Sequence, residues 1–297
     1  VVVTGLGALT PVGNTVAEAW ENLVNGVSGA GPITRFDASK FKTQFACEVK
    51  NFNVADFIDR KEARKMDLYA QYAIVAAKEA IEDSAMDLES VDKNKIGVIF
   101  GVGIGGIRTF EEEMIGYAGT KDTIGPKFNP FFIPKMIADI ASGHISIMYG
   151  FHGPNFTTTS ACASSSNAIA DAFNYIRLGK ANVIVAGGAE AAISPGGVGG
   201  FNAMHALSTR NDEPTKASRP FSASRDGFIM AEGAGCLILE ELEHAKARGA
   251  KIYAELVGAG LSADAHHLTA SHPEGLGAKL VMQNALEDAG MKPEDID

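Results

Sequence analysis

The sequence contains few cysteines and less positive than negative charge. Its three cysteines, Cys47, Cys162 and Cys236, are widely separated in a chain of 297 residues. An odd, scattered set argues against a disulfide framework and a zinc site, and it favours a reducing compartment such as the cytoplasm. Lysine and arginine number 26 against 36 acidic residues, which gives a formal net charge of −10. Nucleic acid and anionic membrane surfaces are therefore poor partners for this protein.

Long apolar runs are also missing. No uninterrupted stretch of about 18 apolar residues could span a bilayer, and no secretory signal peptide is recognisable, so we expect a cytoplasmic protein without membrane segments. Apolar residues make up 46% of the chain and charged residues 21%. These values are ordinary for a soluble globular protein. The length allows one or two domains.

Residues 155–179 predict a strand followed by a helix, with Cys162 at the junction. Residues 155–160 are rich in threonine and phenylalanine, whereas the following residues are small, with apolar ones at helical spacing. A thiol at this junction would meet the positive end of a helix dipole and unpaired backbone N–H groups, which stabilise a thiolate. Two interpretations remain open at this point. Cys162 is a nucleophile on a strand–turn–helix elbow, or it is a buried, inert cysteine.

The N-terminal part predicts a strand, a turn and a helix. Residues 1–5 form an apolar run typical of a buried strand, and a glycine- and proline-rich turn follows it. Thr15 and Glu18 have the spacing of a capping box at a helix start. We expect Trp20 and Leu23, farther along this helix, to face inward.

The next segments contain a predicted helix at 61–84 and a buried strand at 95–100, which runs into the glycine-rich turn 101–106 (GVGIGG). A dinucleotide-binding fingerprint should follow the first strand and open a helix, so we reject that interpretation. The glycines instead indicate close approach of the backbone to a ligand or another segment. Residues 107–134 look irregular and then extended.

Beyond the Cys162 stretch, the sequence predicts an apolar strand at 182–186 and a loop of small residues at 187–200. A second buried strand at 235–239 contains Cys236, which we therefore regard as structural. A helix at 241–248 follows it. The apolar composition of both strands is typical of strands covered on two faces.

The chain contains an internal repeat. The stretch AIEDSAM at 80–86 aligns with ALEDAGM at 285–291, an offset of 205 that continues to the end of the sequence. The strand and glycine turn near 252–260 likewise resemble the first strand. A duplicated α/β unit explains this better than chance similarity between amphipathic helices. The first copy is followed directly by a strand that begins at Lys95. The sequence ends at Asp297, where the corresponding strand of the second copy should begin, so we expect the chain to be incomplete.

Several motifs together resemble one enzyme family. They are TTTSACASS around Cys162, VVVTGLGALTPVGN, GVGIGG, VGGFNAMHALSTRND, SRPFSASRDGF and HAKARGAKIYAELVG. The chain is similar over its whole length to the bacterial β-ketoacyl-acyl-carrier-protein synthases II, the elongating condensing enzymes of fatty-acid synthesis. The resemblance implies a homodimeric thiolase fold of two βαβαβαββ halves in five α-β-α-β-α layers. Residues 1–250 would form the first half and 251–297 the truncated start of the second.

The resemblance also implies the reaction. An acyl group is transferred from acyl carrier protein to Cys162, and decarboxylative Claisen condensation with malonyl-acyl carrier protein then gives the β-ketoacyl product. This chemistry requires a thiolate and a good thiol leaving group, and the N–H of Cys162 would be one oxyanion donor. No metal or redox cofactor is implied, since the substrate carries its own phosphopantetheine.

Further site residues follow from positions that match the family. Ile104 matches the residue at the far end of the acyl pocket that limits chain length. Phe201 and Thr269 match positions at the pantetheine tunnel and the active-site mouth, and Asp264 and His267 belong to the same loop as Thr269. Ordinary core packing remains an alternative for Ile104 and Phe201. The adjacent histidines of that loop lack the helical spacing of a zinc site.

A basic cluster is the predicted docking surface for acyl carrier protein. Lys61, Arg64 and Lys65 have the i, i+3, i+4 spacing of one helix face, and Lys127 would extend the cluster. Acyl carrier protein is strongly acidic, so a local basic patch would attract it despite the net charge of the chain. The alternative is a solvated helix face. His205 stands where related enzymes carry arginine.

One group of family motifs is absent from the sequence. The catalytic histidines, the active-site lysine and the second oxyanion donor of the family belong to HGTST, GH and GFGG motifs, which we expect beyond Asp297. Three other interpretations fit parts of the sequence: a polyketide ketosynthase, a thiolase-type acyl-CoA acyltransferase, and a non-catalytic chain-length factor. The presence of Cys162 argues against the last of these.

Overall fold

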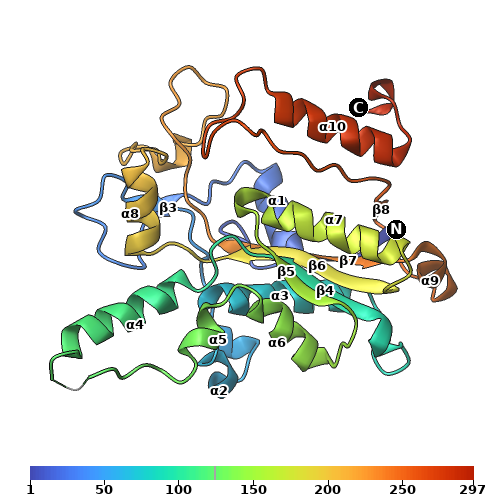
Figure 1. Cartoon of the computed structure of the whole chain (residues 1–297), viewed down its shortest axis with the longest axis horizontal. Coiled ribbons are helices and arrows are strands. Elements are labelled where there is room, and N and C mark those ends of the chain that lie inside the picture. The colour runs from blue at the N-terminus through green and yellow to red at the C-terminus, as the bar shows by residue number, and fades with distance from the viewer. Residues whose placement is uncertain (124) are drawn as a thin grey trace.

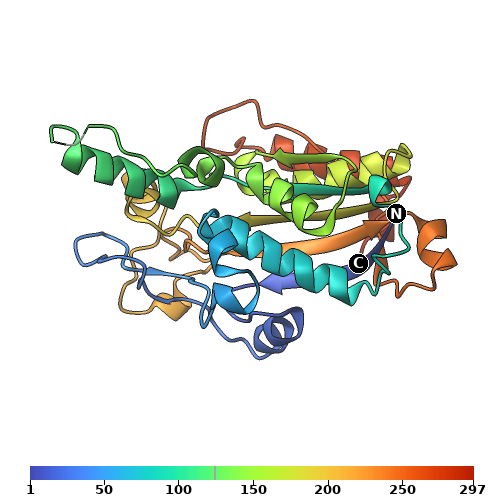
Figure 2. The same cartoon turned by 90° about the horizontal axis from the view of Figure 1, so that it is seen from below.

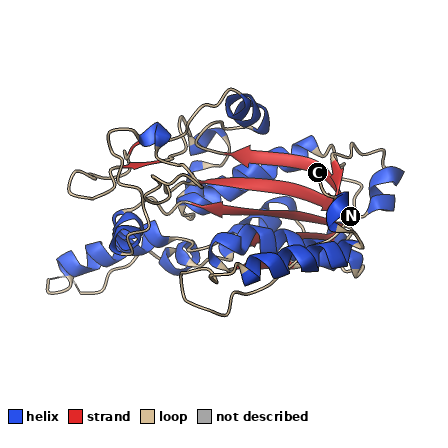
Figure 3. Cartoon of the chain, turned by 90° about the horizontal axis from the view of Figure 1, so that it is seen from above, coloured by secondary structure: helices blue, strands red, loops and turns tan. Residues whose placement is uncertain are grey.

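A six-stranded mixed sheet forms the centre of the molecule. The computed structural model describes residues 1–123 and 125–297, and Figure 3 shows the strands as a layer surrounded by helices. The strand order is β5-β4-β6-β7-β1-β8. In this order the strands are β5 (Asn155–Thr158), β4 (Ile96–Gly101), β6 (Val183–Glu190), β7 (Gly233–Glu240), β1 (Val2–Leu9) and β8 (Ala254–Glu255).

Parallel and antiparallel pairing meet at β6. Strand β4 runs parallel to β5 and β6, whereas β7 pairs antiparallel with both β6 and β1. All of β4 is buried, as is all of β6 except its last residue, which is typical of strands covered on both faces. The buried strands predicted at 95–100, 182–186 and 235–239 are confirmed. A separate two-stranded sheet consists of β2 (Gly31–Pro32) and β3 (Phe45–Ala46).

Helices cover both faces of the main sheet. Helices α3 (Leu68–Asp83) and α6 (Ile140–Tyr149) pack on one face, and α7 (Ser164–Arg177) packs on the other (Figures 1 and 2). Helix α10 (Leu276–Ala289) lies on the α7 side, farther from the sheet (Figure 1). The predicted α/β class is confirmed by this arrangement of layers.

The two copies of the sequence repeat make equivalent backbone contacts. The N–H of Leu6 donates to Asp83 at 2.9 Å, and the N–H of Ala259 donates to Asp288 at 2.9 Å. The two aspartates are separated by the 205-residue offset of the repeat. In each copy a helix therefore holds the strand segment beside it by the same type of hydrogen bond.

Glycines allow the same close approach in both copies. A methyl group placed on Gly7 would lie 1.9 Å from the carbonyl oxygen of Ala76, and one on Gly260 would lie 2.1 Å from that of Val281. Neither position can accept a side chain without moving the helix backbone. Gly7 and Gly260 therefore allow each strand segment to pack directly on the backbone of its helix.

Each repeated aspartate also contacts the other part of the chain. Asp83 accepts a hydrogen bond from the hydroxyl of Tyr253, at 2.8 Å to its nearer oxygen. Asp288 pairs with the guanidinium of Arg177 in α7 at 2.9 Å. The first and last segments of the chain are therefore joined through the same position of the repeat.

Helix α1 (Val16–Val24) begins where the capping pattern predicts. The hydroxyl of Thr15 accepts the N–H of Glu18 at 3.2 Å. The Glu18 carboxylate accepts the N–H of Asn14 at 2.8 Å, one residue before the cap. The N-cap is therefore confirmed, with its reciprocal contact shifted by one residue.

The predicted inner face of α1 is wrong. Trp20 and Leu23 are 68% and 60% exposed, whereas Ala19 is buried. A methyl group placed on Gly13 would lie 2.3 Å from the nitrogen of Ala19. Because the turn approaches the helix backbone so closely, only the small side chain fits on the inner face.

The single helix predicted at 61–84 is also wrong. It is divided into α2 (Arg60–Ala63) and α3, and Asp67 separates them. The Asp67 carboxylate accepts the N–H of Tyr69 at 3.4 Å, which caps α3. It also accepts the hydroxyl of Thr109 at 2.6 Å. The buried Asp67 carboxylate thus binds both the start of α3 and Thr109 in a later helix, and the predicted helix is interrupted at this residue.

Two segments predicted to be irregular are helical. Helices α4 (Ile107–Thr120) and α5 (Phe132–Met136) occupy much of 107–134, in which residue 124 lies outside the described part. Helix α8 (Pro195–Ala203) lies in the segment 187–200 that was predicted to be a loop. The sequence of α8 is rich in glycine, so its stability depends on contacts outside the helix.

The remaining elements are short. Helix α9 (Leu242–Ala247) confirms the prediction at 241–248. The 3-10 turns are η1 (Val54–Asp56), η2 (Lys93–Lys95), η3 (Ala161–Ala163), η4 (Pro214–Lys216) and η5 (Pro293–Asp295). Within 1–123 and 125–297, no helix has the length and apolar character needed to cross a membrane.

A buried carboxylate links β7 to β1 and α9. Glu240 accepts hydrogen bonds from the hydroxyl of Thr4 at 2.7 Å and from Arg248 Nε at 2.7 Å. Nδ1 of His244 lies 2.6 Å from the same carboxylate. Burial alone would raise the pKa of Glu240, but the hydrogen bonds from Arg248, Thr4 and His244 hold it below the ordinary value.

Candidate active site

Cys162 lies in a tight turn between β5 and α7. The turn η3 contains it, and the preceding Ala161 has a φ of +52°, which is uncommon for a residue other than glycine. The hydroxyl of Ser164 donates to the carbonyl oxygen of Ala161 at 2.7 Å and accepts the N–H of Ser160 at 2.9 Å. Hydrogen bonds on both sides of the cysteine therefore hold the elbow that the sequence predicted.

Glycines in two strands bring the start of α7 against the sheet. A methyl group on Gly101, at the end of β4, would lie 2.2 Å from the carbonyl carbon of Ser164. One on Gly188, in β6, would lie 1.8 Å from Oγ of Ser165. The position of Cys162 thus depends on two strand residues that lack side chains.

Cys162 differs from the other two cysteines in its exposure. It is exposed, Cys47 is partly buried and Cys236 is buried. Burial raises the pKa of Cys236 far above that of an ordinary thiol, and it also raises the pKa of Cys47. Cys162 is therefore the cysteine that a substrate can reach, and its exposure excludes the buried, inert interpretation.

The cysteine opens into a cavity of about 710 Å³. Ile104 and Phe201 line this cavity together with Cys162. The other lining residues come from the start of the chain, the ends of β4 and β6, and the segment before β7. They include Leu9, Pro11, Gly103, Ala192, Phe228 and Met230. Most of these residues are apolar, as the wall of an acyl-binding pocket must be.

The residues predicted to form the mouth of the active site lie outside the lining of this cavity. Asp264, His267 and Thr269 are not among the residues that line the cavity. Asp264 accepts the N–H of Gly277 at 3.2 Å, and Nδ1 of His267 accepts the N–H of Thr269 at 3.2 Å. Their contacts are therefore local, and their role at the mouth remains a prediction.

Glu190 reaches the cavity and was not predicted. It is the last residue of β6, and its Oε2 accepts the N–H of Ile104 at 2.8 Å. Burial raises the pKa of Glu190, although the N–H groups of residues 103–105 favour its ionised form. An acidic residue that directly follows seven apolar or small strand residues was the available signal in the sequence.

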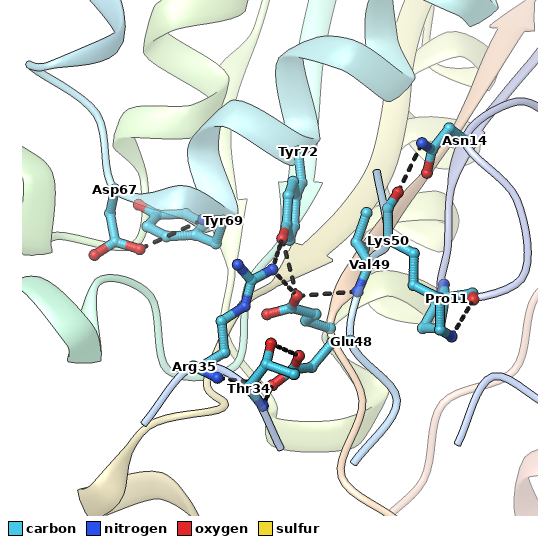
Figure 4. Close-up of polar contacts among 11 residues, drawn as sticks. Pro11, Asn14, Thr34, Arg35, Glu48, Val49, Lys50, Asp67, Tyr69 and Tyr72 are labelled. Atoms are coloured by element: carbon cyan, nitrogen blue, oxygen red, sulfur yellow. Dashed lines mark hydrogen bonds and ion pairs between the residues drawn. The ribbon is translucent and has the colours of Figure 1, made fainter. Parts of the chain in front are cut away.

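A second acidic residue, Glu232, also lines the cavity and was also missed. Its carboxylate accepts the hydroxyl of Tyr72 at 3.0 Å and the N–H of Val49 at 3.0 Å, and it pairs with Arg35. Figure 4 shows the Arg35 guanidinium beside the Tyr72 hydroxyl. This network ties the segment before β7 to α3 and to the loop that contains Arg35.

The predicted docking residues do not share one long helix. Lys61 lies in α2, Arg64 forms its C-cap, and Lys65 follows that cap. The i, i+3, i+4 face that the sequence suggested is thus corrected to a short helix and the turn after it. Lys61 and Arg64 are exposed, as a docking role requires.

Lys65 has partners within the chain. Its ammonium group lies 2.6 Å from Glu62 and 5.9 Å from the centre of the Phe131 ring. Lys127, a few residues before Phe131, is exposed. The Lys65–Phe131 contact therefore brings the segment containing Lys127 towards the turn after α2.

No cluster of three or more histidine, cysteine, aspartate or glutamate side chains in 1–123 and 125–297 has the arrangement of a metal site. His266 contacts the ring of His272 at a centroid distance of 5.3 Å, with the rings at 62°. These rings make an edge-to-face contact.

Family models match nearly the whole chain. The N-terminal domain of β-ketoacyl synthases matches residues 1–245, and the C-terminal domain matches residues 253–297. Among curated proteins, the chain is 49% identical over 296 residues to 3-oxoacyl-[acyl-carrier-protein] synthase 2 of Staphylococcus aureus strain COL. That match covers 100% of this chain and 70% of the relative. The same enzyme of a Synechocystis strain is 50% identical, with 99% and 70% covered.

Solved structures show the same fold. A β-ketoacyl synthase from Burkholderia phymatum superposes with a TM-score of 0.89 at 34% identity, covering 99% of this chain and 71% of that one. A ketosynthase solved in complex with a type II polyketide acyl-carrier protein gives a TM-score of 0.88, also at 34% identity, with the same coverage. The thiolase-type fold that the sequence implied is confirmed by these likenesses.

Proposed function

This chain belongs to the β-ketoacyl synthase family, and we propose that it elongates fatty acids by condensation, with Cys162 as the residue that carries the acyl chain. The observation that supports this role is the position of Cys162. It is the exposed cysteine, it occupies a constrained elbow at the start of α7, and it lines an apolar cavity. A thioester nucleophile requires such access, and a position just before a helix favours the thiolate form of a cysteine.

The reaction proceeds in two transfers. The Cys162 thiolate attacks the acyl thioester, the bond between the acyl carbon and the pantetheine sulfur breaks, and the pantetheine leaves as a thiolate that takes up a proton from solvent. Malonyl-acyl carrier protein then loses CO2, and the resulting carbanion attacks the acyl-cysteine, which releases the thiolate. The N–H of Cys162 precedes the first turn of α7, where backbone donors lack helical partners, and it stabilises the oxyanion.

Substrate contacts are assigned within the same proposal. Ile104 limits the length of the acyl chain, and Phe201 contacts the pantetheine arm where it enters the cavity. Asp264, His267 and Thr269 belong to the mouth. The substrate carries the phosphopantetheine, so the proposal gives the protein no cofactor of its own.

Acylation of Cys162 can be tested directly. The full-length enzyme is incubated with an acyl-carrier thioester, and the adduct is mapped by peptide mass spectrometry. We expect the acyl mass on the Cys162 peptide, and no adduct in Cys162→Ala. Acyl mass on Cys47 or Cys236 with Cys162 unmodified would falsify the assignment.

Acyl carrier protein is the proposed partner, and it docks on Lys61, Arg64, Lys65 and Lys127. Lys61 and Arg64 are free to meet an acidic surface, because neither takes part in the ion pairs found within the described residues. Lys65 lies beside them but contacts Glu62. Charge complementarity of this kind acts mainly on the encounter rate and on partner choice.

The active protein is proposed to be a cytoplasmic homodimer. Strand β5 is an edge of the described sheet, so one of its sides is available for pairing. Helix α6 packs against β5. Large apolar side chains are exposed on α4, α5 and α6, including Phe110, Met114, Ile115, Ile133 and Ile147. Three free cysteines suit a reducing compartment. Light scattering coupled to size-exclusion chromatography would test the dimer.

Synthesis of polyketides is the second candidate. It has support from the solved ketosynthase that binds a polyketide acyl-carrier protein, at 34% identity. The fatty-acid synthases are more similar, at 49% and 50%. Analysis of the products formed with malonyl-acyl carrier protein distinguishes the two, because a fatty-acid synthase adds one two-carbon unit per cycle and releases it for reduction.

A further inference from the structure

Glu190 holds the glycine-rich segment that presents Ile104 to the cavity. Its Oε2 accepts the N–H of Ile104 at 2.8 Å, and its Oε1 accepts the N–H of Gly105 at 3.3 Å. One carboxylate thus binds two consecutive backbone donors. The carboxylate belongs to β6, whereas the segment follows β4, so the contact joins two strands beyond their paired region.

The segment is also confined from the opposite side. A methyl group placed on Gly103 would lie 2.7 Å from Oε2 of Glu190 and 3.6 Å from the carbonyl oxygen of Ala161. Ala161 is the strained residue directly before Cys162. The backbone at Gly103 therefore passes between the Glu190 carboxylate and the elbow that holds the cysteine.

Such a segment needs an external anchor. Glycine has the greatest backbone freedom of all residues, and Gly105 adopts a φ of +80°. Ile104 is the large side chain of the segment, is 45% exposed, and lines the cavity. Beyond the Glu190 contacts, the next tether is the N–H of Gly106, which donates to the carbonyl oxygen of Met136 at 3.0 Å. Glu190 is thus the side chain that holds the backbone at Ile104 itself.

We propose that Glu190 is a positioning residue that sets acyl chain-length selectivity by fixing Ile104 in the cavity wall. The inference rests on the proposed roles of Cys162 and Ile104. With both tethers in place, Ile104 blocks long acyl chains. When one tether is lost, the segment moves away from the cavity and long chains enter more readily.

The variant Glu190→Gln tests this role. Its side chain has nearly the same size, but its amide nitrogen cannot accept an N–H, so one acceptor faces two donors. In the full-length enzyme, we measure kcat/KM with hexanoyl- and hexadecanoyl-acyl carrier protein. The ratio of the long to the short primer should rise about tenfold, since a lost hydrogen bond of about 1.4 kcal/mol corresponds to that factor.

Glu48→Gln is the matched control. Glu48 is buried, and like Glu190 it accepts the N–H groups of two consecutive residues, Thr34 at 2.9 Å and Arg35 at 3.2 Å, here through Oε1. It does not line the cavity. The Glu48→Gln substitution should leave the ratio of long-primer to short-primer kcat/KM at the wild-type value, even if it lowers the melting temperature. A similar change of ratio in both variants would contradict the proposal.

A double-variant cycle separates positioning from general damage. In the background Ile104→Ala, Glu190→Gln should have no further effect on the primer ratio, because the side chain that it positions is gone. An equal loss for both primers, or a full additional effect in Ile104→Ala, would overturn the inference. If Glu190→Gln does not fold, Gly103→Ala replaces it, because its methyl group displaces the segment from the carboxylate and should raise the ratio.

Different results would contradict the proposed function and the inference about Glu190. It is contradicted if the wild-type enzyme acylates another cysteine or condenses neither primer. The inference about Glu190 is contradicted if the wild-type enzyme is acylated on Cys162 while the primer ratio in Glu190→Gln stays unchanged.

Discussion

Arg248 holds the buried carboxylate of Glu240 with two N–H groups, Nε at 2.7 Å from one oxygen and Nη2 at 2.8 Å from the other. The contact joins α9 to β7, and Thr4 of β1 donates to the same carboxylate. The pair is bidentate, and the Glu240 side chain is fully buried whereas that of Arg248 is 19% exposed. Bidentate arginine–carboxylate pairs are among the stronger hydrogen-bonded ion pairs.

This pair predicts how stability depends on pH. The pKa of Glu240 in the folded chain lies below its ordinary value of 4.5. The ionised group therefore contributes stability above that pH, and the contribution is lost as the pH falls through the lower pKa of the folded state. We expect the free energy of unfolding to decrease below about pH 4.5. His244 faces the same carboxylate through Nδ1.

Chemical denaturation at several pH values measures this effect. In Glu240→Gln the stability should be lower at pH 7, and its decrease between pH 5 and pH 3 should be smaller than in the wild type, roughly as linkage requires. The same acid-induced decrease in both proteins would show that other carboxylates account for it.

A methyl group in β6 should displace the nucleophile. Gly188→Ala places a carbon 1.8 Å from Oγ of Ser165, so the start of α7 has to move. A shift of about 1 Å in a reacting group can cost on the order of a hundredfold in rate. We expect acyl transfer to Cys162 to slow by roughly tenfold to a hundredfold in stopped-flow measurements.

Gly235→Ala is the control for this experiment. Gly235 also lines the cavity, but a methyl group there meets no atom within 4 Å. Its acylation rate should stay near the wild-type value. Equal slowing in both variants would indicate that any added methyl group in these strands disturbs the protein.

A larger side chain at position 104 should shorten the accepted chains. Ile104→Phe adds volume in the cavity wall, and overpacking costs about 1–3 kcal/mol. Hexadecanoyl transfer should fall by roughly tenfold or more, while hexanoyl transfer remains. The comparison is made by primer competition with product analysis, and equal loss for both primers would show a folding defect instead.

Charge reversal tests the docking surface. Lys61→Glu combined with Arg64→Glu should raise the apparent KM for carrier-bound substrate roughly threefold to tenfold and reduce its dependence on salt. The kcat value should change little. Lys180→Glu is the control, because Lys180 is exposed and follows the opposite end of α7 from Cys162. An unchanged KM and salt response in the double variant would contradict the docking role and show that Lys61 and Arg64 only face solvent.

The elements that the sequence predicted well have local causes. The strands at 95–100, 182–186 and 235–239 are short apolar runs, and their pattern does not depend on distant residues. The elbow at Cys162 follows from a change of composition from threonine-rich to small residues. The family motifs added Ile104 and Phe201, which the structure brings into one cavity with Cys162.

The elements that were missed depend on tertiary contacts. Helix α8 contains four glycines, yet the carboxylate of Glu111 accepts the N–H of Gly196 at 2.6 Å and the hydroxyl of Ser194, its cap, at 2.9 Å. Helix α4 starts at Gly106 without a side-chain cap. No local pattern encodes a partner 85 residues away in the chain.

The same reason explains the missed acidic residues and the break at Asp67. Glu190 and Glu232 act on backbone donors and side chains from distant segments, so their sequence neighbours do not reveal them. Asp67 lies in an uninterrupted helical pattern, and its partner Thr109 lies more than one element away. Trp20 fits an inward helical position, but the close turn at Gly13 leaves room only for alanine there.

The aspartates at equivalent positions of the repeat, Asp83 and Asp288, each take part in two different contacts. Asp83 and Asp288 each accept a backbone N–H from the strand segment of their own copy. Each also contacts a side chain in the other part of the chain, Tyr253 for Asp83 and Arg177 for Asp288. A single substitution at either aspartate therefore removes two contacts together, one within a copy of the repeat and one between the two parts of the chain.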